Sequence, residues 1–533
     1  MSPVRVLPDS RRAARALLAL ALLGLAPSAL AAQVAPLPEI QKGPFAIASW
    51  DFDFGTTTTT HPATGQPLNV NHFGRVWYPT DGATDPESPA AVGDFPLVAF
   101  GHGRFHTAPF IGFNHEGADY LMEHLASWGI VAASVNLDVV GQFGFPAAIP
   151  QRGDILLETL ERFIDLNNQG VSAPVGLADA VDATRLGVAG HSRGGEGTIA
   201  ALVENAQSAN PLPILAAGTI APTDFEGYTA PADVPTMGLY GTKDGDVNNG
   251  WPIFVHDRSV AEEKVFENIH GANHFWFTED ITCVCEGSGD ISRGAHHTMA
   301  RAFLGGFLIR KLRTAPNESA AVFCDGPELA GLTNIVETHP MYRDPSRFVI
   351  DDFEQNPSLA LTSEGAPAFA THLANLESSF NASGATLYHL TRGFEAAWAQ
   401  SIPGIWATLL SPTGFDATGW SHLSMKFTQQ RNSPVNVPDQ AQDVTIGLLD
   451  VHNDLALVPL SSWGTIPWPI QHPSGGPFQN FPVKSVLRTT RIPLSAFTEA
   501  NPALDLDALT WAGWMSGVTV QGEVQFDDFE FTD

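Results

Sequence analysis

The chain has 533 residues, more than one hydrophobic core usually organises, so two or three domains are expected. Apolar residues make up 44% of it, beside 49 Gly and 40 Pro, which is typical of a globular protein with many loops. The net charge of −30 argues against nucleic acid and anionic membranes as partners. Three cysteines are too few for a disulfide framework or a zinc site, although Cys324 could pair with Cys283 or Cys285 in an oxidising compartment.

The first 31 residues have the composition of a secretory signal peptide. Four Arg residues precede an apolar run at 16–25, and small residues at 29–31 suit cleavage. This run is too short to span a bilayer and no later stretch is long enough, so a secreted or periplasmic protein without a membrane span is expected. Cleavage after residue 31 would remove four Arg and one Asp, which lowers the net charge from −30 to −33.

Between residues 45 and 312 short apolar runs alternate with amphipathic stretches. The spacing predicts strands at 75–78, 95–100, 130–135, 186–189, 214–220, 236–240 and 264–269. It predicts helices at 118–128, 155–166, 196–206 and 297–312. This alternation favours an α/β domain at residues 40–314, with a mainly parallel sheet and helices on both faces.

The pattern changes after residue 314. A Pro-containing linker is expected at 315–344, and an all-β sandwich resembling a jelly roll at 345–533. The last domain opens with F-V-I-D-D-F-E at 348–354 and closes with V-Q-F-D-D-F-E-F at 524–531. Two matched terminal strands that pair with each other would close such a sandwich.

The segment G-H-S-R-G at 190–194 carries the strongest chemical signal. Ser192 follows a short buried strand and precedes a helix, and glycines flank it at both second neighbours. This is the spacing of a nucleophile elbow, where strand and helix pass too closely for side chains. A glycine-rich turn with an incidental serine is the alternative for the pentapeptide alone.

A serine hydroxyl needs a histidine base with a carboxylate behind it. Asp244 is the first carboxylate after the strand at 236–240, so we expect it to orient the imidazole, with Asp246 as the alternative. His274, in the loop after the strand at 264–269, is expected to be the acid–base in preference to His270.

Three other histidines are expected to be structural. His296 and His297 fit the start of a helix, and His191 fits packing within the elbow turn.

Two backbone N–H groups are expected to bind the oxyanion. One belongs to Arg193, directly after the serine, and the other to Arg104, in the G-H-G-R-F loop at 101–105. This chemistry requires no cofactor.

Residues from about 70 to 312 resemble the α/β-hydrolase branch that holds platelet-activating-factor acetylhydrolases, cutinase-like polyester hydrolases and chlorophyllases. The similar segments are V-W-Y-P-T at 76–80, F-G-H-G at 100–103, G-H-S-R-G-G at 190–195 and G-A-N-H-F at 271–275. The resemblance implies the α/β-hydrolase fold and ester hydrolysis by Ser192, His274 and Asp244. The chain departs from compact polyesterases in the loop at 278–293, in Arg193 and in its C-terminal domain.

The I-D-D-F-E and F-D-D-F-E strings resemble galactose-binding-like jelly rolls that serve as carbohydrate-binding modules. Seven of the twelve Trp residues follow residue 397, which would suit stacking on sugar rings. A place in the core is the favoured alternative for Trp398, Trp406, Trp420, Trp511 and Trp514.

Four acidic residues lie in those two strings. Asp351, Asp352, Asp527 and Asp528 could hold a structural calcium ion through carboxylate oxygens, or could be solvated strand ends.

The sequence therefore predicts a secreted serine hydrolase that cleaves a small-molecule or polymeric carboxylic ester through an acyl-enzyme. The alternatives are a carbohydrate esterase that deacylates a polysaccharide bound by the C-terminal domain, a serine peptidase, and a catalytically silent surface-binding protein.

Overall fold

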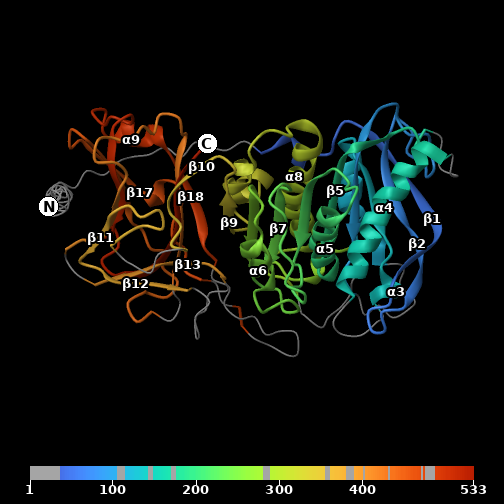
Figure 1. Ribbon diagram of the computed structural model, residues 1–533, viewed down its shortest axis with the longest axis horizontal. Helices are drawn as coiled ribbons and strands as arrows, with labels where there is room; N and C mark the ends of the chain where they lie inside the picture. The colour runs from blue at the N-terminus through green and yellow to red at the C-terminus, as the bar shows by residue number, and fades with distance from the viewer. Residues whose placement is uncertain are drawn as a thin grey trace, which may run out of the picture. The chain divides into compact units, whose positions relative to one another are not determined.

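The protein divides into two compact units in a computed structural model (Figure 1). Residues 34–345 and 471–482 form an α/β unit, and residues 346–470 and 483–533 belong to a β unit. The structure describes residues 36–104, 114–141, 148–169, 176–279, 288–354, 360–379, 389–399, 402–429, 433–469, 472–473 and 486–533. The expected signal peptide at 1–31 lies outside these residues.

The α/β unit is built on a nine-stranded mixed sheet with a parallel centre, as the alternating pattern predicts. The strand order is β1-β2-β4-β3-β5-β6-β7-β8-β9, and the strands from β4 to β8 in this order run parallel. The edges β1, β2 and β9 are antiparallel to their neighbours. The bounds are β1 Ala46–Thr60, β2 Pro67–Thr80, β3 Phe95–Gly101, β4 Val131–Val135, β5 Val181–His191, β6 Ile214–Ile220, β7 Thr236–Gly241, β8 Lys264–Ile269 and β9 Thr338–Arg343.

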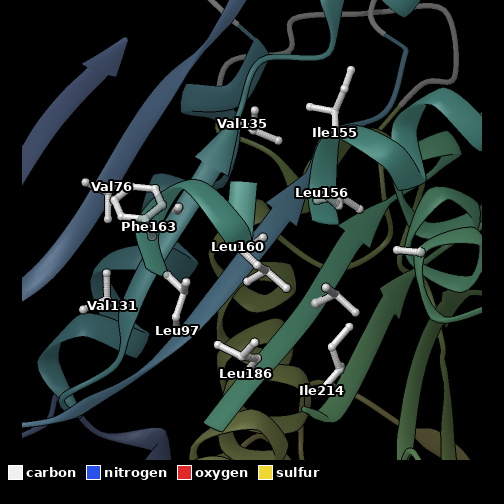
Figure 2. Packing of buried hydrophobic residues seen from close by; sticks show 14 of the residues in the cluster. Val76, Leu97, Val131, Val135, Ile155, Leu156, Leu160, Phe163, Leu186 and Ile214 are labelled. Carbon is white, nitrogen blue, oxygen red and sulfur yellow. The ribbon is translucent and has the colours of Figure 1, made fainter. Parts of the chain in front are cut away.

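The central strands are apolar throughout because both faces of the sheet are covered. Every residue of β3, β4 and β8 is buried. Figure 2 shows one covering layer, in which Leu156, Leu160 and Phe163 of helix α4 lie over the strand residues Leu97 and Leu186. This packing holds fixed the strand ends from which the site is built.

The predicted helices form, with shifts at their ends. The α-helices of the unit are α2 Asp119–Ser127, α3 Asp138–Gly141, α4 Ile149–Gln169, α5 Arg193–Gln207, α6 Trp251–Arg258, α7 Arg293–Ala300 and α8 Gly306–Ile309. Short 3₁₀ and π segments are η1 Pro38–Ile40, η2 Asn114–Ala118, η3 Phe275–Phe277, η4 Arg301–Gly305, η5 Arg310–Thr314 and η6 Ala320–Ala330. The helix expected at 297–312 begins earlier, at Arg293, because the Ser292 hydroxyl caps it by accepting the N–H of Ala295 at 3.1 Å.

The segment expected to be a linker at 315–344 is instead part of the α/β unit. It contains η6 and β9, and β9 pairs with β8 so that Thr338 lies opposite Ile269. Its prolines suggested a linker, but Pro340 lies on the last strand of the sheet, where proline is tolerated. The boundary between the units therefore falls at residue 345 rather than 314.

The β unit contains two antiparallel sheets. One has the order β12-β13-β20-β15-β18, with β10 also paired to β20, and the other has the order β11-β14-β19-β16-β17. The bounds are β10 Arg347–Asp351, β11 Ala368–Thr371, β12 Ala374–Ser379, β13 Arg392–Trp398, β14 Ile405–Leu409, β15 His422–Gln429, β16 Thr445–Asp450, β17 Leu455–Pro459, β18 Arg488–Pro493, β19 Leu509–Met515 and β20 Gly522–Thr532, with α9 at Leu494–Ala500 and η7 at Leu460–Ser462. The predicted pairing of the terminal strands is confirmed, with Phe348 opposite Phe531.

Most of the tryptophans in question lie in the core of the β unit. Trp398, Trp406 and Trp514 are at most 3% exposed, and the rings of Trp406 and Phe526 lie 5.1 Å apart. Trp511 belongs to a separate small cluster on the second sheet. Core packing therefore accounts for the buried indoles without a ligand.

Candidate active site

Ser192 lies at the turn between β5 and α5, in a backbone conformation that serine rarely adopts. Its φ is 56° and its ψ is −125°. The turn is held by the Ser192 N–H, which donates to the carbonyl of Ile220 at 2.8 Å, and by the Ser192 carbonyl, which accepts from Glu196 at 3.2 Å. Such strain persists only where the surroundings impose it, and it is the geometry of a nucleophile elbow.

The glycines around Ser192 are required by close backbone approach. A Cβ on Gly190 would lie 2.3 Å from the carbonyl oxygen of Gly194, and a Cβ on Gly194 would lie 2.0 Å from that of Gly101. No side chain fits at either position. The alternative of an incidental glycine-rich turn does not explain this crossing of β3, β5 and α5.

Asp244 and His274 meet at the carboxyl ends of β7 and β8. The Nδ1 atom of His274 lies 2.8 Å from Oδ2 of Asp244, and the two side chains are 1% and 0% exposed. The other carboxylate oxygen, Oδ1, accepts the N–H groups of Asp246 at 3.0 Å and Val247 at 2.7 Å. Asp244 is thus fixed by its own turn and lies in contact with Nδ1 of His274, which is the placement that orienting the imidazole would require.

Asp246, the alternative acid, approaches the other edge of the same ring. Its Oδ2 lies 3.6 Å from Nε2 of His274, and its side chain is 36% exposed. A carboxylate on the Nε2 side cannot orient Nδ1. The geometry therefore assigns Asp246 to the rim of the site.

The loop that carries His274 packs against the turn that carries Ser192, and His191 makes the contact. Its Nε2 donates to the backbone carbonyl of His274 at 3.2 Å, and the two ring centres are 4.5 Å apart. Burial lowers the pKa of His191 well below its usual value, so the ring is neutral at pH 7. His191 joins the two loops, consistent with the packing role expected for it.

The loop after β3 passes directly over Ser192. A Cβ on Gly103 would lie 2.7 Å from the Cβ of Ser192 and 3.2 Å from its Oγ. Arg104 follows this glycine, and Arg193 begins α5 on the other side of the serine. The two N–H groups expected to bind the oxyanion therefore belong to segments that flank the hydroxyl.

Two residues that the sequence did not single out hold this loop. Arg152, on α4, is fully buried and donates from Nη1 to the carbonyl of His102 at 2.9 Å. Nε2 of His102 accepts the N–H of Leu137 at 2.7 Å, so Nδ1 carries the proton and donates to the carbonyl of Gly103 at 2.7 Å. Burial lowers the pKa of His102 to about 3 and that of Arg152 to about 9.

The room for Arg152 comes from a glycine on the neighbouring helix. A Cβ on Gly197 of α5 would lie 2.8 Å from the Cβ of Arg152. An arginine in an amphipathic helix is normally read as a surface charge, so only the crossing of α4 and α5 reveals its role.

His296 also holds the loop that carries His274. Nε2 of His296 accepts the N–H of Asn273 at 2.9 Å, while its Nδ1 lies 2.9 Å from the carbonyl of Ser292. Burial lowers the pKa of His296 to about 4, which keeps the accepting nitrogen unprotonated. His297 stacks on Tyr120, with ring centres 3.9 Å apart.

Among the described residues, one group of side chains could hold a metal ion. Ligand atoms of His270, Glu337 and His339 all lie within 4.8 Å of one another. Nε2 of His270 is 3.2 Å from Nδ1 of His339, and Nε2 of His339 is 3.1 Å from Oε1 of Glu337. His270 is thus engaged with β9 and not with the proposed acid, which agrees with the preference for His274.

The aspartates considered for calcium already have partners within the protein. Asp351 accepts the N–H groups of Phe353 at 3.0 Å and Ser363 at 2.9 Å, and Asp528 pairs with Lys426. Asp527 is buried, and burial raises its pKa well above the usual value. Calcium at Asp351, Asp352, Asp527 and Asp528 stays a prediction.

The loops at 105–115, 137–152 and 278–293, which we expect to shape the pocket, lie partly outside the described residues, at 105–113, 142–147 and 280–287. Cys283 and Cys285 fall in the last of these, so their pairing with Cys324 stays a prediction. None of the described helices combines the length and apolar character that crossing a membrane requires.

Residues 55–287 match the family model described as PET hydrolase-like. This family consists of polyester hydrolases of the α/β-hydrolase type, so the match supports an ester-hydrolysing enzyme. The matched PET hydrolase-like region includes Ser192, Asp244 and His274 and ends before β9 and the β unit. No curated protein matches the chain.

Proposed function

We propose that this protein is a serine ester hydrolase in which Ser192 is the nucleophile, His274 the general base and acid, and Asp244 the residue that orients the imidazole. The observation that carries the proposal is the 2.8 Å contact between Asp244 and His274, on a loop that packs against the strained turn bearing Ser192. The PET hydrolase-like match over the same residues supports ester chemistry independently.

In this proposal Oγ of Ser192 attacks the acyl carbonyl while its proton passes to Nε2 of His274. Asp244 stabilises the resulting imidazolium through Nδ1–H. The N–H groups of Arg193 and Arg104 stabilise the negative charge on the carbonyl oxygen. His274 then returns the proton to the departing alcohol, which leaves an acyl-enzyme.

Water completes the cycle. His274 removes a proton from the water molecule that attacks the acyl-enzyme, and the proton passes to Oγ of Ser192 as the carboxylic acid leaves. All of these steps use side chains and backbone groups of this chain, so the proposal needs no cofactor.

For the substrate we propose a polyester or a short ester that resembles one repeat of such a polymer. The PET hydrolase-like match favours this class over peptides. We further propose that the protein acts after export, with residues 1–31 removed.

Polysaccharide deacylation remains the second candidate, although the observation that suggested it is weaker. Three of the tryptophans proposed to stack on sugars lie in the core of the β unit, and Trp511 contacts Phe369, with ring centres 5.4 Å apart. Affinity electrophoresis of the whole protein in gels with xylan, pectin or cellulose tests this directly. Retardation by one of them would favour the carbohydrate esterase.

The proposed function is tested with p-nitrophenyl acetate and butyrate, using the parent protein and Ser192→Ala. We expect hydrolysis and fluorophosphonate labelling by the parent, and a loss of turnover of about 10⁶-fold in the variant. A variant that hydrolyses these esters as fast as the parent would refute the role of Ser192. A parent that neither hydrolyses nor takes the label would favour a silent surface-binding protein.

A further inference from the structure

A hydrogen bond outside the proposed triad joins the two loops that carry its acid and its base. Oγ1 of Thr242 accepts the N–H of Gly271 at 2.9 Å. Thr242 precedes Asp244 by two residues, and Gly271 precedes His274 by three. The position of this one hydroxyl therefore affects the separation of the two loops.

The partner of that hydroxyl comes from far along the chain. His472 belongs to residues 471–482, which follow β17 in sequence but group with the α/β unit. Its Nε2 lies 2.8 Å from Oγ1 of Thr242, and its Nδ1 lies 2.8 Å from Oδ2 of Asp290. Both His472 and Thr242 are buried.

Asp290 is itself tied to the same two loops. Its carboxylate pairs with Lys243, next to Thr242, and its backbone N–H donates to the carbonyl of Gly271 at 2.8 Å. Because a carboxylate only accepts, Nδ1 of a neutral His472 carries the proton and Nε2 accepts from the Thr242 hydroxyl. Thr242 then accepts from Gly271 and donates to His472, so each polar atom has a partner.

We infer that His472 is a positioning residue for the proposed triad, since it fixes a hydroxyl that joins the Asp244 loop to the His274 loop. This tie adds to the backbone hydrogen bond from the Lys243 N–H to the carbonyl of Ala272 at 2.9 Å. The inference rests on the proposed function. The order of hydroxyl, imidazole and carboxylate is also that of a triad, but Thr242 is 1% exposed and out of reach of a substrate. Its role is therefore support, not a second reaction.

The test replaces His472 by alanine in the full chain and measures kcat, KM and the pH–rate profile on p-nitrophenyl butyrate. Rates are expressed per active site counted with a fluorophosphonate, so that misfolded protein does not contribute. We expect kcat to fall about tenfold at unchanged KM, because Asp244 shifts relative to the imidazole. The acid limb of the pH–rate profile should move down by roughly half a pH unit, because the imidazolium of His274 is stabilised less and its pKa falls.

Among the described residues, Asp244, Asp246 and His191 are titratable groups that face His274, and the variant retains all three. A change in the acid limb therefore reports their placement and not the loss of a charge. The low-field NMR signal of the proton between Asp244 and His274 should weaken or shift in parallel.

Two variants separate positioning from general stability. His389→Ala removes a buried imidazole of the β unit, whose Nε2 accepts the N–H of Leu487 at 2.9 Å. It should lower the melting temperature and leave the rate per site unchanged. His472→Gln keeps a side-chain acceptor within reach of Thr242, and it should recover part of the lost kcat.

The inference is overturned if His472→Ala keeps kcat within about twofold and the acid limb of the parent. It is also overturned if the melting temperature falls while the rate per site does not. In both cases an active parent and an inactive Ser192→Ala would leave the proposed function intact. Hydrolysis that survives in Ser192→Ala would instead remove the triad on which the inference depends.

Discussion

At the scale of single residues, the candidate site depends on glycines, which have no side chain, as much as on the residues that carry its functional groups. Ser192 adopts a φ of 56° and is crossed by glycines on both sides. Only glycine allows such a close approach, so the G-x-S-x-G pattern predicts this turn without a structure. The sequence does not predict the need for glycine at 103, because the clash that a side chain would cause there involves Ser192, far along the chain.

Gly103→Ala should disable the proposed oxyanion site. The new methyl group would lie 2.7 Å from the Cβ of Ser192, so the loop must move away from the hydroxyl. Loss of one oxyanion donor costs about 10²–10³ in kcat, and we expect a loss in that range on p-nitrophenyl butyrate. Gly294→Ala is the control, since its methyl group would meet nothing closer than 3.8 Å. Parent-like turnover by Gly103→Ala would mean that this loop does not serve the oxyanion.

Arg152→Met should separate activity from stability. The guanidinium holds the carbonyl of His102, so its loss should lower kcat about 10–10²-fold by loosening the proposed oxyanion loop. Burial lowers the pKa of Arg152 to about 9, so the guanidinium is still charged at pH 7, but burying this charge opposes folding. An apolar side chain of similar volume should therefore leave the melting temperature nearly unchanged. Equal losses of activity and stability would show that Arg152 supports the fold alone.

At the scale of elements, the strand ends place the site and the helices behind them keep it in position. β5, β7 and β8 end next to Ser192, Asp244 and His274 in turn, as expected at the carboxyl end of a parallel sheet. The last two strands run parallel and adjacent, which brings a carboxylate and an imidazole thirty residues apart within 2.8 Å.

His296→Phe should loosen the loop that carries His274. Its Nε2 accepts the N–H of Asn273, and a phenyl ring keeps the packing but removes that acceptor. We expect kcat to fall about tenfold while KM changes little. His256→Phe, a similar change on α6, is the control and should retain parent kinetics. An unchanged kcat in His296→Phe would show that Asn273 needs no anchor.

At the scale of the whole molecule, the stability of the β unit should depend on pH. Burial raises the pKa of Asp351, in the β unit, to about 6. A carboxyl group whose pKa is raised on folding stabilises the folded state below its unfolded pKa, and this contribution is lost as the pH rises through 6.

Asp351→Asn should therefore stabilise the β unit above pH 6. The amide oxygen can still accept the N–H groups of Phe353 and Ser363, and no charge is buried. We expect a gain of up to about 2–3 kcal/mol at pH 8 and little change at pH 4. Thermal melts at both values check this, with Asp352→Asn as the control. A gain of equal size at both values would contradict the titration argument.

The predicted calcium site would also affect the stability of the β unit. If calcium binds at the four aspartates, its addition should raise the melting temperature of the parent at pH 7, and a chelator should lower it. Asp527→Asn should abolish that response. A melting temperature that does not change when calcium is added would refute the predicted calcium site.

The sequence by itself determined the order of the chemistry: an elbow serine, then a carboxylate, then a histidine, each after a strand that its own apolar residues define. These signals are local, and strands and glycine turns depend mainly on neighbouring residues. Tertiary structure decided what holds the groups in place. Arg152, His296 and His472 act through contacts between distant segments, and β9 becomes a strand because β8 offers it a free edge. The periodic pattern of apolar residues in the sequence does not predict such contacts, because each contact forms between two segments that are distant in the sequence.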